Sequence, residues 1–333
     1  MTKPEAGRVL VLSRGEIGRL MSFSDYVEAV EAGFKAAAEG HAVAPPALSL
    51  NVKDGAFHAK GAAFPLGDRV YVAMKINGNF AENRARRGLP TVQGAIYLAN
   101  GCNGMPLAVM DSIGVTIERT GAATAVAARH LARSDARTAF VCGAGVQGRV
   151  QLRAVELVCP LERAFVFDID SKAAIALAER MSAELGIPVS AAPDLARARE
   201  CDVVVTCTSA HRAFLGPDHL RPGAFVAAVG ADNHDKQEID PALFPRATVV
   251  VDSLEQCAEI GDLHHALAAG TFTRERVHAS LAEIVAGQKP GRRSAEEITL
   301  FDSTGLGLQD VAAAAVIYER ALARGAGTRL SLA

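Results

Sequence analysis

Continuous apolar runs alternate with helical segments over the second part of the chain. A helix predicted at "IERTGAATAVAARHLA" is followed by five short runs, each bounded by glycine or a polar turn: "TAFVCG", "RAFVFD", "CDVVVTCT", "AFVAAVG" and "TVVVDS". Unbroken apolar strands are typical of parallel sheets, because helices cover both faces of the sheet. The pattern therefore predicts an α/β fold with a doubly wound parallel sheet.

The first part of the chain follows a different pattern. A helix is predicted from Ser24 to Glu39, because its apolar residues recur at helical spacing. Short strands separated by Gly, Asn and Pro turn signals come next: "AFHAKGAAF", "RVYVAMKIN", "TVQGAIYLAN" and "PLAVMDSI". Turns of this kind join antiparallel strands, so a mainly antiparallel sheet is predicted. The last helix, "LQDVAAAAVIYERALARG", could pack back on this part, so neither of the two domains expected from 333 residues need be contiguous.

Composition narrows the functional class. The 35 basic and 37 acidic residues leave a formal net charge of −2, which favours neither nucleic acid nor an anionic membrane as a partner. The N-terminal segment is too polar for a signal peptide, and no later run approaches the roughly 18 apolar residues of a membrane span. A cytoplasmic protein is therefore predicted.

The cysteine and histidine patterns predict no metal site. The six cysteines show no Cys-x-x-Cys spacing and several lie inside apolar runs, which favours reduced, packed thiols over disulfides or zinc. His264 and His265 lie near Asp262, but adjacent residues rarely point the same way and no third ligand is spaced for them.

The segment "TAFVCGAGVQGR" carries the most specific local motif. Gly143, Gly145 and Gly148 form G-x-G-x-x-G between a strand and a helix, where such glycines permit a tight turn, close approach of a pyrophosphate and close helix packing. The next strand ends in Asp168, twenty positions after Gly148, where a carboxylate can bind the ribose hydroxyls and repel a 2′-phosphate. The motif predicts a dinucleotide site that prefers NAD(H) over NADP(H). The alternative is an ordinary glycine turn with a surface aspartate.

Charged residues within apolar strands are candidates for the chemistry. Lys75 in "YVAMKIN" must reach water, pair with an anion or lose its proton, because an unpaired buried charge is costly. A lysine on a solvated strand face is the alternative, and Lys60 and Arg119 allow the same two interpretations. Asp232 follows "AVG" at the carboxyl end of a strand, where ligands bind in open parallel sheets. It could be catalytic there or cap the following turn.

Several segments, in order and at suitable spacing, resemble the ornithine cyclodeaminase/μ-crystallin family over nearly the whole chain. They are "MKINGNF", "RGLPTVQGAIYL", "GMPLAVMDSIGVTIERTGAATAVAARHLAR", "GAGVQGR", "GADNHDKQEID" and "FDSTGLGLQD". The resemblance implies an NAD-binding Rossmann-type domain at residues 118–308. It also implies an α+β domain made of residues 1–117 and 309–333, which binds the substrate and forms a homodimer through its sheet.

The resemblance further implies roles for individual residues. Lys75 and Arg119 match positions that bind the carboxylate of the substrate and neighbouring groups. Asp232 matches the catalytic carboxylate, and Lys75 is assigned to catalysis beside it. Cofactor contacts are expected from the fingerprint and from residues elsewhere in the chain: Gly143, Gly145, Val146, Gln147, Gly148, Asp168, Thr91, Thr206, Lys236 and Ser303.

One position departs from the family pattern. Members that handle ornithine typically carry an arginine shortly after a proline, before the first strands, and it grips the α-carboxylate. In "AVAPPALSLNV" the corresponding residue is Ala47. Loss of one charged bidentate contact costs about 2–3 kcal/mol unless another cation replaces it. His58 or Lys60, on the nearby "FHAK" strand, is the candidate replacement.

The implied function is NAD(H)-dependent oxidoreduction at the α-carbon to nitrogen bond of a small L-amino or imino acid. The family default is ornithine cyclodeaminase activity, in which an imine forms, closes into a ring with loss of ammonia and is reduced again. Attack of water on the imine would instead give an alanine-type amino-acid dehydrogenase, and the reductive direction gives a ketimine reductase. A non-catalytic μ-crystallin-like binding protein is the alternative of another class. The presence of Lys75, Arg119 and Asp232 together counts against it.

Overall fold

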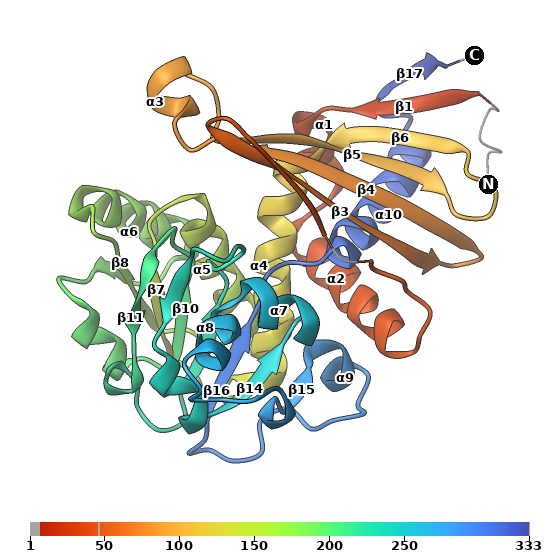
Figure 1. Ribbon diagram of the computed structural model, residues 1–333. Coiled ribbons are helices and arrows are strands. Elements are labelled where there is room, and N and C mark those ends of the chain that lie inside the picture. Colours follow the sequence, from red (N-terminus) through yellow and green to blue (C-terminus); the bar gives the residue numbers. More distant parts are fainter. Residues whose placement is uncertain (1–6, 46, 333) are drawn as a thin grey trace. The chain divides into compact units, whose positions relative to one another are not determined.

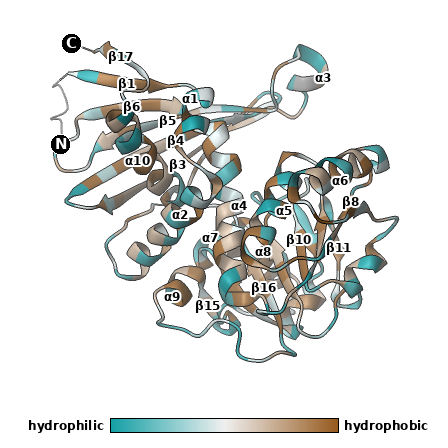
Figure 2. Ribbon diagram, turned by 180° about the vertical axis from the view of Figure 1, so that it is seen from behind, coloured by the Kyte–Doolittle hydropathy of each residue, from teal (hydrophilic) through white to brown (hydrophobic). Residues whose placement is uncertain are grey.

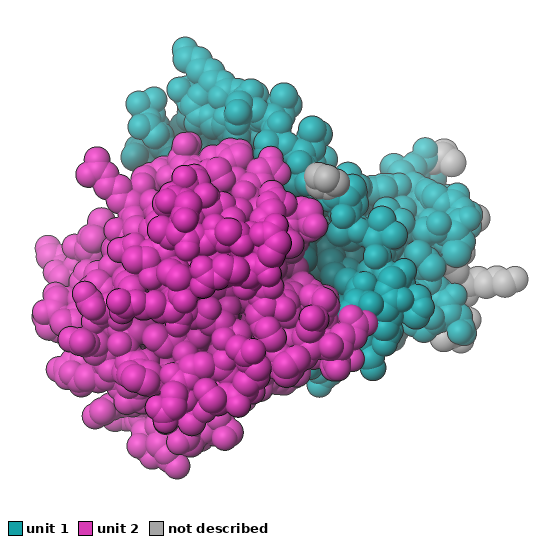
Figure 3. Space-filling view, turned by 60° about the horizontal axis from the view of Figure 1, so that its bottom comes forward, with its two compact units in different colours: residues 1–119, 306–333 teal, residues 120–305 magenta. Residues whose placement is uncertain are grey.

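The fold was analysed in a computed structural model, which describes residues 7–45 and 47–332. Contacts divide the chain into two units, one made of residues 1–119 and 306–333 and the other of residues 120–305 (Figure 3). We call them the split unit and the continuous unit. The assignment of the cofactor to a domain at 118–308, and of the substrate to a domain at 1–117 and 309–333, stays a prediction.

The continuous unit is built on an eight-stranded sheet in which every pair of neighbours is parallel (Figure 1). The strand order is β15-β14-β16-β12-β10-β7-β8-β9, so β16 lies between β12 and β14. The predicted α/β fold with a doubly wound parallel sheet is confirmed. The strands are β7 (Thr138–Cys142), β8 (Arg163–Phe167), β9 (Val189–Ala191), β10 (Val203–Thr206), β12 (Phe225–Ala228), β14 (Ala247–Val251), β15 (Ala279–Ser280) and β16 (Ile298–Asp302), and a separate pair joins β11 (His211–Leu215) to β13 (Gln237–Ile239).

Each of the five apolar runs singled out in the sequence forms a strand of this sheet. Their central residues are buried on both faces, as Phe140, Val204 and Val226 illustrate with no exposed surface. Figure 2 shows the hydrophobic colour of these strands. Burial on both faces explains why the runs lack the alternation of a half-exposed strand.

Short helices connect these strands. The α-helices are α5 (Val146–Val158), α6 (Ser171–Leu185), α7 (Leu254–Ile260), α8 (Asp262–Ala268) and α9 (Leu281–Val285), with 3₁₀ turns at Leu195–Glu200, Pro217–His219, Pro241–Arg246 and Arg274–Arg276. Most of them begin at a capping side chain, and Asp170 accepts hydrogen bonds from the first turn of α6. Helix α5 is an exception, because its N-cap residue is Gly145.

The split unit contains a seven-stranded sheet in the order β17-β1-β6-β5-β4-β3-β2. All neighbours are antiparallel except β1 and β6, which confirms the mainly antiparallel sheet. The elements are β1 (Arg8–Leu12), α1 (Arg14–Leu20), α2 (Phe23–Ala38), β2 (Leu48–Val52), β3 (Gly55–Leu66), β4 (Arg69–Asn79), α3 (Asn83–Arg87), β5 (Val92–Asn100), β6 (Pro106–Asp111), α10 (Gly307–Arg324) and β17 (Thr328–Ser331).

Helices pack on one face of this sheet, and the other face is more exposed. Helix α10 packs on β3 and β4, and α2 packs on α10 (Figure 1). Strand β4 therefore buries alternate residues, among them Ala73 and Lys75, against the helix side. Met74 and Ile76 point to the opposite face and are 42% and 51% exposed. Large apolar side chains of that second face are thus partly exposed.

Helix α4 (Ser112–Leu131) begins five residues before the start expected at Ile117. Ser112 and Gly114 are weak helix formers, so the sequence before Ile117 resembles a turn. The backbone N–H of Gly114 donates to Asp111 Oδ1 at 2.9 Å, and this contact supports the first turn of the helix. Strands β1 and β17 and helix α1 were also not expected from the sequence.

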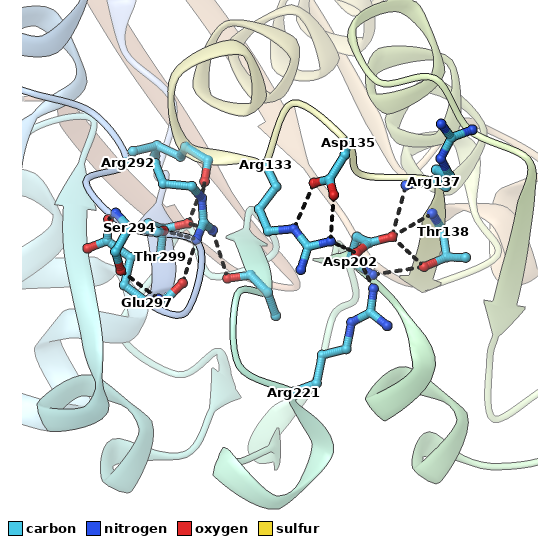
Figure 4. Close-up of polar contacts among 12 residues, drawn as sticks. Arg133, Asp135, Arg137, Thr138, Asp202, Arg221, Arg292, Ser294, Glu297 and Thr299 are labelled. Carbon is cyan, nitrogen blue, oxygen red and sulfur yellow. Dashed lines mark hydrogen bonds and ion pairs between the residues drawn. The ribbon is translucent and has the colours of Figure 1, made fainter.

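A buried carboxylate organises the amino ends of β7 and β10 (Figure 4). Asp202 Oδ2 accepts hydrogen bonds from the backbone N–H of Arg137 at 2.8 Å and from the backbone N–H and the hydroxyl of Thr138 at 3.0 and 2.8 Å. Arg221 pairs with the other oxygen. Burial would raise the pKa of Asp202, but these donors outweigh it and the pKa lies below its ordinary value. The role of the buried Asp202 carboxylate is therefore structural: it fastens the start of β10 to the start of β7.

All six cysteines are free thiols, and Cys142, Cys159, Cys201 and Cys257 are buried, as the sequence predicted. Within residues 7–45 and 47–332, no helix has the length and hydropathy of a membrane span.

Candidate cofactor cavity and candidate substrate site

The turn between β7 and α5 has the backbone that its glycines predict. Gly143 adopts a φ of +112°, and its N–H donates to the carbonyl oxygen of Phe167 at 2.8 Å. A Cβ atom on Gly148 would collide with the carbonyl oxygen of Gly143, so helix and turn can approach only without a side chain there. A Cβ on Gly145 would meet no protein atom within 4 Å. The backbone at Gly145 therefore faces open space.

That space belongs to a cavity of about 750 Å³ in the continuous unit. Its lining includes five predicted cofactor residues, which the structure brings together: Gly143, Gly145, Val146, Gln147 and Asp168. Further lining residues were not predicted: Ile169, Cys207, Thr208, His211 and Phe214 are among them. Most of these follow β8 and β10, so a search for residues just after the apolar strands could have found them.

Asp168 is held in one orientation by backbone donors. Its Oδ2 accepts from the N–H of Ala144 at 2.7 Å and its Oδ1 from the N–H of Asp170 at 2.9 Å. Each carboxylate oxygen keeps a further lone pair for a ligand hydroxyl. The carboxylate thus stands beside the glycine turn, at the edge of the cavity.

These residues fit a dinucleotide. The cavity has the size of a ligand site, the first turn of the thirteen-residue helix α5 offers backbone N–H groups to phosphate, and Gly145 leaves the phosphate room. Gly143 and Gly145 would cradle the pyrophosphate, Gly148 would let helix α5 approach the turn, and Asp168 would bind the ribose.

The other predicted cofactor residues lie elsewhere. Thr206 and Ser303 are buried at the carboxyl ends of β10 and β16, and the Ser303 hydroxyl donates to Asp252 Oδ2 at 3.0 Å. Neither is among the residues that line the cavity. Thr91 belongs to the split unit, where its carbonyl oxygen accepts from the N–H of Phe80 at 2.8 Å.

Asp232 and Lys236 form an ion pair after β12. The Lys236 Nζ lies 2.7 Å from Asp232 Oδ1 and 3.2 Å from the carbonyl oxygen of Gly230. The side chain of Asp232 is 51% exposed, so its carboxylate is reachable. The structure brings these two predicted residues together in an ion pair.

Lys75 and Arg119 meet at a shared carboxylate in the split unit. Lys75 Nζ lies 2.6 Å from Asp310 Oδ2, and Arg119 Nε lies 3.1 Å from Asp310 Oδ1. All three side chains are less than 10% exposed, so the interpretation of Lys75 as a lysine on a solvated face is wrong. Arg119 Nη1 also donates to Gln309 Oε1 at 2.7 Å.

Burial shifts the titration of this cluster. It lowers the pKa of Lys75 to about 7, with Arg119 and Lys60 acting in the same direction and Asp310 opposing them. Burial would raise the pKa of Asp310, but Lys75 and Arg119 outweigh it and hold the pKa below its ordinary value. Asp310 thus lies between two cationic side chains, Lys75 and Arg119, an arrangement that suits an anionic ligand.

Lys60 and His58 lie on β3, one strand from Lys75. Lys60 is directly opposite Lys75 in the antiparallel register, whereas His58 Nδ1 lies 3.0 Å from the Ser49 hydroxyl on β2. Ala47 immediately precedes β2. Lys60 thus faces the cluster from the neighbouring strand, and the replacement of the missing arginine by Lys60 or His58 stays a prediction.

Several buried acids were not predicted. Asp310 is the fourth residue of α10, and Glu238, Asp262 and Asp302 are fully buried in the continuous unit. Burial raises the pKa of Asp302 to about 7 and raises the pKa of both Glu238 and Asp262. Asp310 carried one usable signal, a single carboxylate at the start of the apolar segment "VAAAAV".

The adjacent histidines have structural contacts. His265 Nε2 lies 2.9 Å from the carbonyl oxygen of Lys236, and the rings of His264 and His265 are 5.1 Å apart at their centroids. Among the residues that the structure describes, no group of three or more His, Cys, Asp or Glu side chains could hold a metal ion.

Comparison with known proteins identifies relatives over the whole chain. Residues 8–325 match the model of the Ornithine cyclodeaminase/mu-crystallin family. An alanine dehydrogenase of Archaeoglobus fulgidus is 37% identical over 321 residues, which cover 96% of this chain and 98% of the relative. The structure of an archaeal alanine dehydrogenase dimer with bound NAD superimposes with a TM-score of 0.93 at 36% identity, covering 98% of this chain and all of that one. That of the Thermococcus litoralis Δ(1)-pyrroline-2-carboxylate reductase with NADH and L-proline gives a TM-score of 0.91 at 36% identity, covering 96% and 99%.

These similarities test three of the predictions. They confirm the fold class, since both solved structures align over nearly their full length. They confirm that the protein is an enzyme, since its relatives are named as dehydrogenases and reductases. The family predicted from the sequence motifs is confirmed as well: this chain belongs to the Ornithine cyclodeaminase/mu-crystallin family.

Proposed function

We propose that the protein is an NAD(H)-dependent oxidoreductase that interconverts a small L-amino acid and its imine, as an imino-acid reductase or an alanine-type dehydrogenase. The observation that carries the proposal is the buried cluster of Lys75 and Arg119 around Asp310, which has an excess of positive charge. A cationic cluster of this kind suits the carboxylate that every such substrate has.

The residues of the chain have distinct tasks in this reaction. Lys75 and Arg119 bind the substrate carboxylate, and Arg119 can offer two parallel N–H donors. Asp232 holds or receives the proton that the substrate nitrogen releases when the amine becomes an imine, and Lys236 orients the Asp232 carboxylate through their ion pair.

A bound nicotinamide would accept hydride from the α-carbon or return it to the imine. The glycines of the β7–α5 turn hold the pyrophosphate, and Asp168 binds the adenosine ribose and disfavours a 2′-phosphate. NAD(H) is therefore the proposed cofactor in preference to NADP(H).

The protein is further proposed to act as a homodimer through the uncovered face of the seven-stranded sheet. Met74, Tyr97 and Val109 are opposite one another on β4, β5 and β6 and are 37–42% exposed. Large exposed apolar patches mark association surfaces. The location in the cytoplasm stays a prediction.

Ornithine cyclodeaminase activity is the second candidate, because it gives the family part of its name. The same carboxylate cations and the same proton acceptor would serve it. Ala47 counts against ornithine as the substrate, since the arginine expected at this position would grip the α-carboxylate. The missing contact makes the first candidate the stronger one.

Turnover assays in both directions separate these functions. The purified protein is given NADH with pyruvate and ammonia, with pyruvate and methylamine, or with Δ1-pyrroline-2-carboxylate; in parallel it is given NAD and L-ornithine and assayed for proline. The proposal expects NADH consumption in at least one reductive reaction and no proline from ornithine. Proline without accumulation of NADH would establish the cyclodeaminase instead.

A variant pair tests the assigned proton carrier. Asp232→Asn should lower kcat at least about a hundredfold and leave the fluorescence change on NADH binding intact. The exposed neighbour Asp235 supplies the control, because Asp235→Asn should leave turnover unchanged. NADH binding without turnover of any substrate in the wild-type protein would favour a binding protein.

A further inference from the structure

One buried carboxylate connects the two cations of the candidate substrate site. Asp310 is 1% exposed, and each of its oxygens contacts a different cation: Oδ2 lies 2.6 Å from Lys75 Nζ and Oδ1 lies 3.1 Å from Arg119 Nε. The three residues come from β4, α4 and α10. Asp310 therefore ties together three elements that are far apart in the sequence.

These contacts occupy only part of the donors of each cation. Arg119 has five N–H donors, and the described contacts use Nε for Asp310 and Nη1 for Gln309. Lys75 has three N–H donors, of which one faces Asp310. Two long side chains that would otherwise lose several rotamers on binding are thus already ordered. The remaining donors can meet a substrate carboxylate at little entropic cost.

The groups around Lys75 make its positive charge depend on the Asp310 carboxylate. The charged groups that face Lys75 are Asp310 from α10, Arg119 from α4 and Lys60 from β3, and its partner on β5 is the apolar Ile96. Burial and both cations favour the neutral amine, and Asp310 alone of these groups favours the ammonium. Without the carboxylate, Lys75 would be a buried lysine beside two cations.

We propose that Asp310 is a positioning residue of the substrate site, which orients Lys75 and Arg119 for the substrate carboxylate and keeps Lys75 charged. This inference rests on the proposed function, because it assumes a substrate with a carboxylate. A purely structural ion pair would stabilise the split unit without affecting how substrate binding depends on pH.

The first test is the pH profile of kcat/KM for Asp310→Asn, with the best substrate of the wild-type protein. Because the amide has nearly the shape of the carboxylate and lacks its charge, the pKa of Lys75 should fall. The alkaline limb of the profile should then move to lower pH by at least about one unit. At pH 7.5 KM should rise about tenfold or more, with a smaller change in kcat.

A matched control is an ion pair that holds the same helix, α10, to another element. Asp25 on α2 pairs with Arg320 of α10 through contacts of 2.6 and 2.7 Å. Asp25→Asn also removes a carboxylate that pairs with a cation between α10 and another element, so it should lower the melting temperature and leave KM and the pH profile unchanged. An Asp310→Asn protein with a wild-type KM and profile, and only a lower melting temperature, would overturn the proposal.

A second measurement does not depend on turnover. NMR of protein with ¹³C-labelled lysine side chains, with the Lys75 signal assigned by its loss in Lys75→Met, reports the titration midpoint of Lys75 directly. The midpoint should fall in Asp310→Asn by at least about one pH unit, and equal midpoints would contradict the inference. If the wild-type protein turned over no substrate, the proposed function would fail while this midpoint still tested Asp310.

Asp310→Glu covers the case in which Asp310→Asn does not fold. Glutamate keeps the charge and moves the carboxylate by one methylene group. The proposal expects a raised KM together with a wild-type alkaline limb, because orientation changes and charge does not. A wild-type KM in this variant would rule out positioning by Asp310.

Discussion

At the candidate cofactor cavity, hydrogen bonds fix the orientation of the Asp168 carboxylate. Asp168 is fixed by the N–H groups of Ala144 and Asp170, so its carboxylate cannot turn away from a ligand in the cavity. In the proposed complex this fixed anion would lie beside the ribose and would repel a 2′-phosphate.

Asp168→Asn should therefore weaken NADH and reduce its advantage over NADPH. Loss of charged hydrogen bonds to the ribose costs about 2 kcal/mol, or roughly thirtyfold in Kd, whereas NADPH binding should change little or improve. Fluorescence titration with both cofactors measures the ratio. Asp170→Asn is the control: it also replaces a carboxylate by an amide, but asparagine caps a helix about as well as aspartate, so stability and cofactor preference should both stay nearly unchanged.

The sequence carried part of this residue-level information. Asp168 could be predicted because its spacing from the glycines is fixed by one strand and one helix. Lys75 could be identified as unusual but not as buried, since a strand alternates faces and the sequence does not say which face α10 covers. Asp310 could not be predicted, because its partners Lys75 and Arg119 lie 235 and 191 positions away in the chain.

At the scale of elements, the β7–α5 turn contains one glycine that the fold requires and another that only a ligand would require, within six residues. Gly148 must be glycine for the helix to approach the turn, because a Cβ would collide with the backbone of Gly143. Gly145 has a φ of −79° and open space around it, so the folded protein itself makes no such demand there. Only a ligand would require the absence of a side chain at Gly145.

Alanine substitutions at Gly148 and Gly145 should therefore have different effects on stability and on NADH affinity. Gly148→Ala should destabilise the protein by about 3 kcal/mol, because turn and helix must separate. Gly145→Ala should keep the melting temperature or raise it slightly, since alanine restricts the unfolded chain, and yet weaken NADH at least about tenfold. Thermal melting and NADH titration of both variants make the comparison. Loss of stability in Gly145→Ala, with unchanged affinity, would contradict the cofactor assignment.

The elements themselves could be predicted where one physical cause dominates. Burial on both faces produces the apolar runs of β7, β8, β10, β12 and β14, so these strands were evident. Helix α4 was predicted too short, because Ser112 and Gly114 have low helix propensity and tertiary contacts override it. Strands β1 and β17 are held by pairing between the two ends of the chain, and no local pattern reports that pairing.

At the scale of the whole molecule, the uncovered face of the seven-stranded sheet is the main surface feature. Besides the row formed by Met74, Tyr97 and Val109, Ile76 is 51% exposed on the same side of β4. A face of this kind on a lone protomer would invite association. The proposed homodimer would bury it.

Ile76→Lys should prevent the proposed dimer from forming, because dimerisation would bury an ammonium group in an apolar interface. Light scattering after size-exclusion chromatography gives the mass, with 34.8 kDa expected for one chain. Ile175→Lys on α6 is the matched control, since Ile175 is 49% exposed in the continuous unit. A wild-type protein that elutes as a monomer would refute the proposed assembly.

The split unit is assembled from both ends of the chain, and this has a consequence for synthesis. After residue 119 has been translated, residues 120–305 must follow before α10 and β17 exist, which takes roughly 10–40 s at about 5–20 residues per second. During that interval the sheet lacks its covering helix, and Lys75 and Arg119 lack Asp310. The nascent chain therefore presents the inner face of its first sheet to the ribosome surface and to chaperones, and the continuous unit is completed only when its inner strand β16 is made at the end of the same interval.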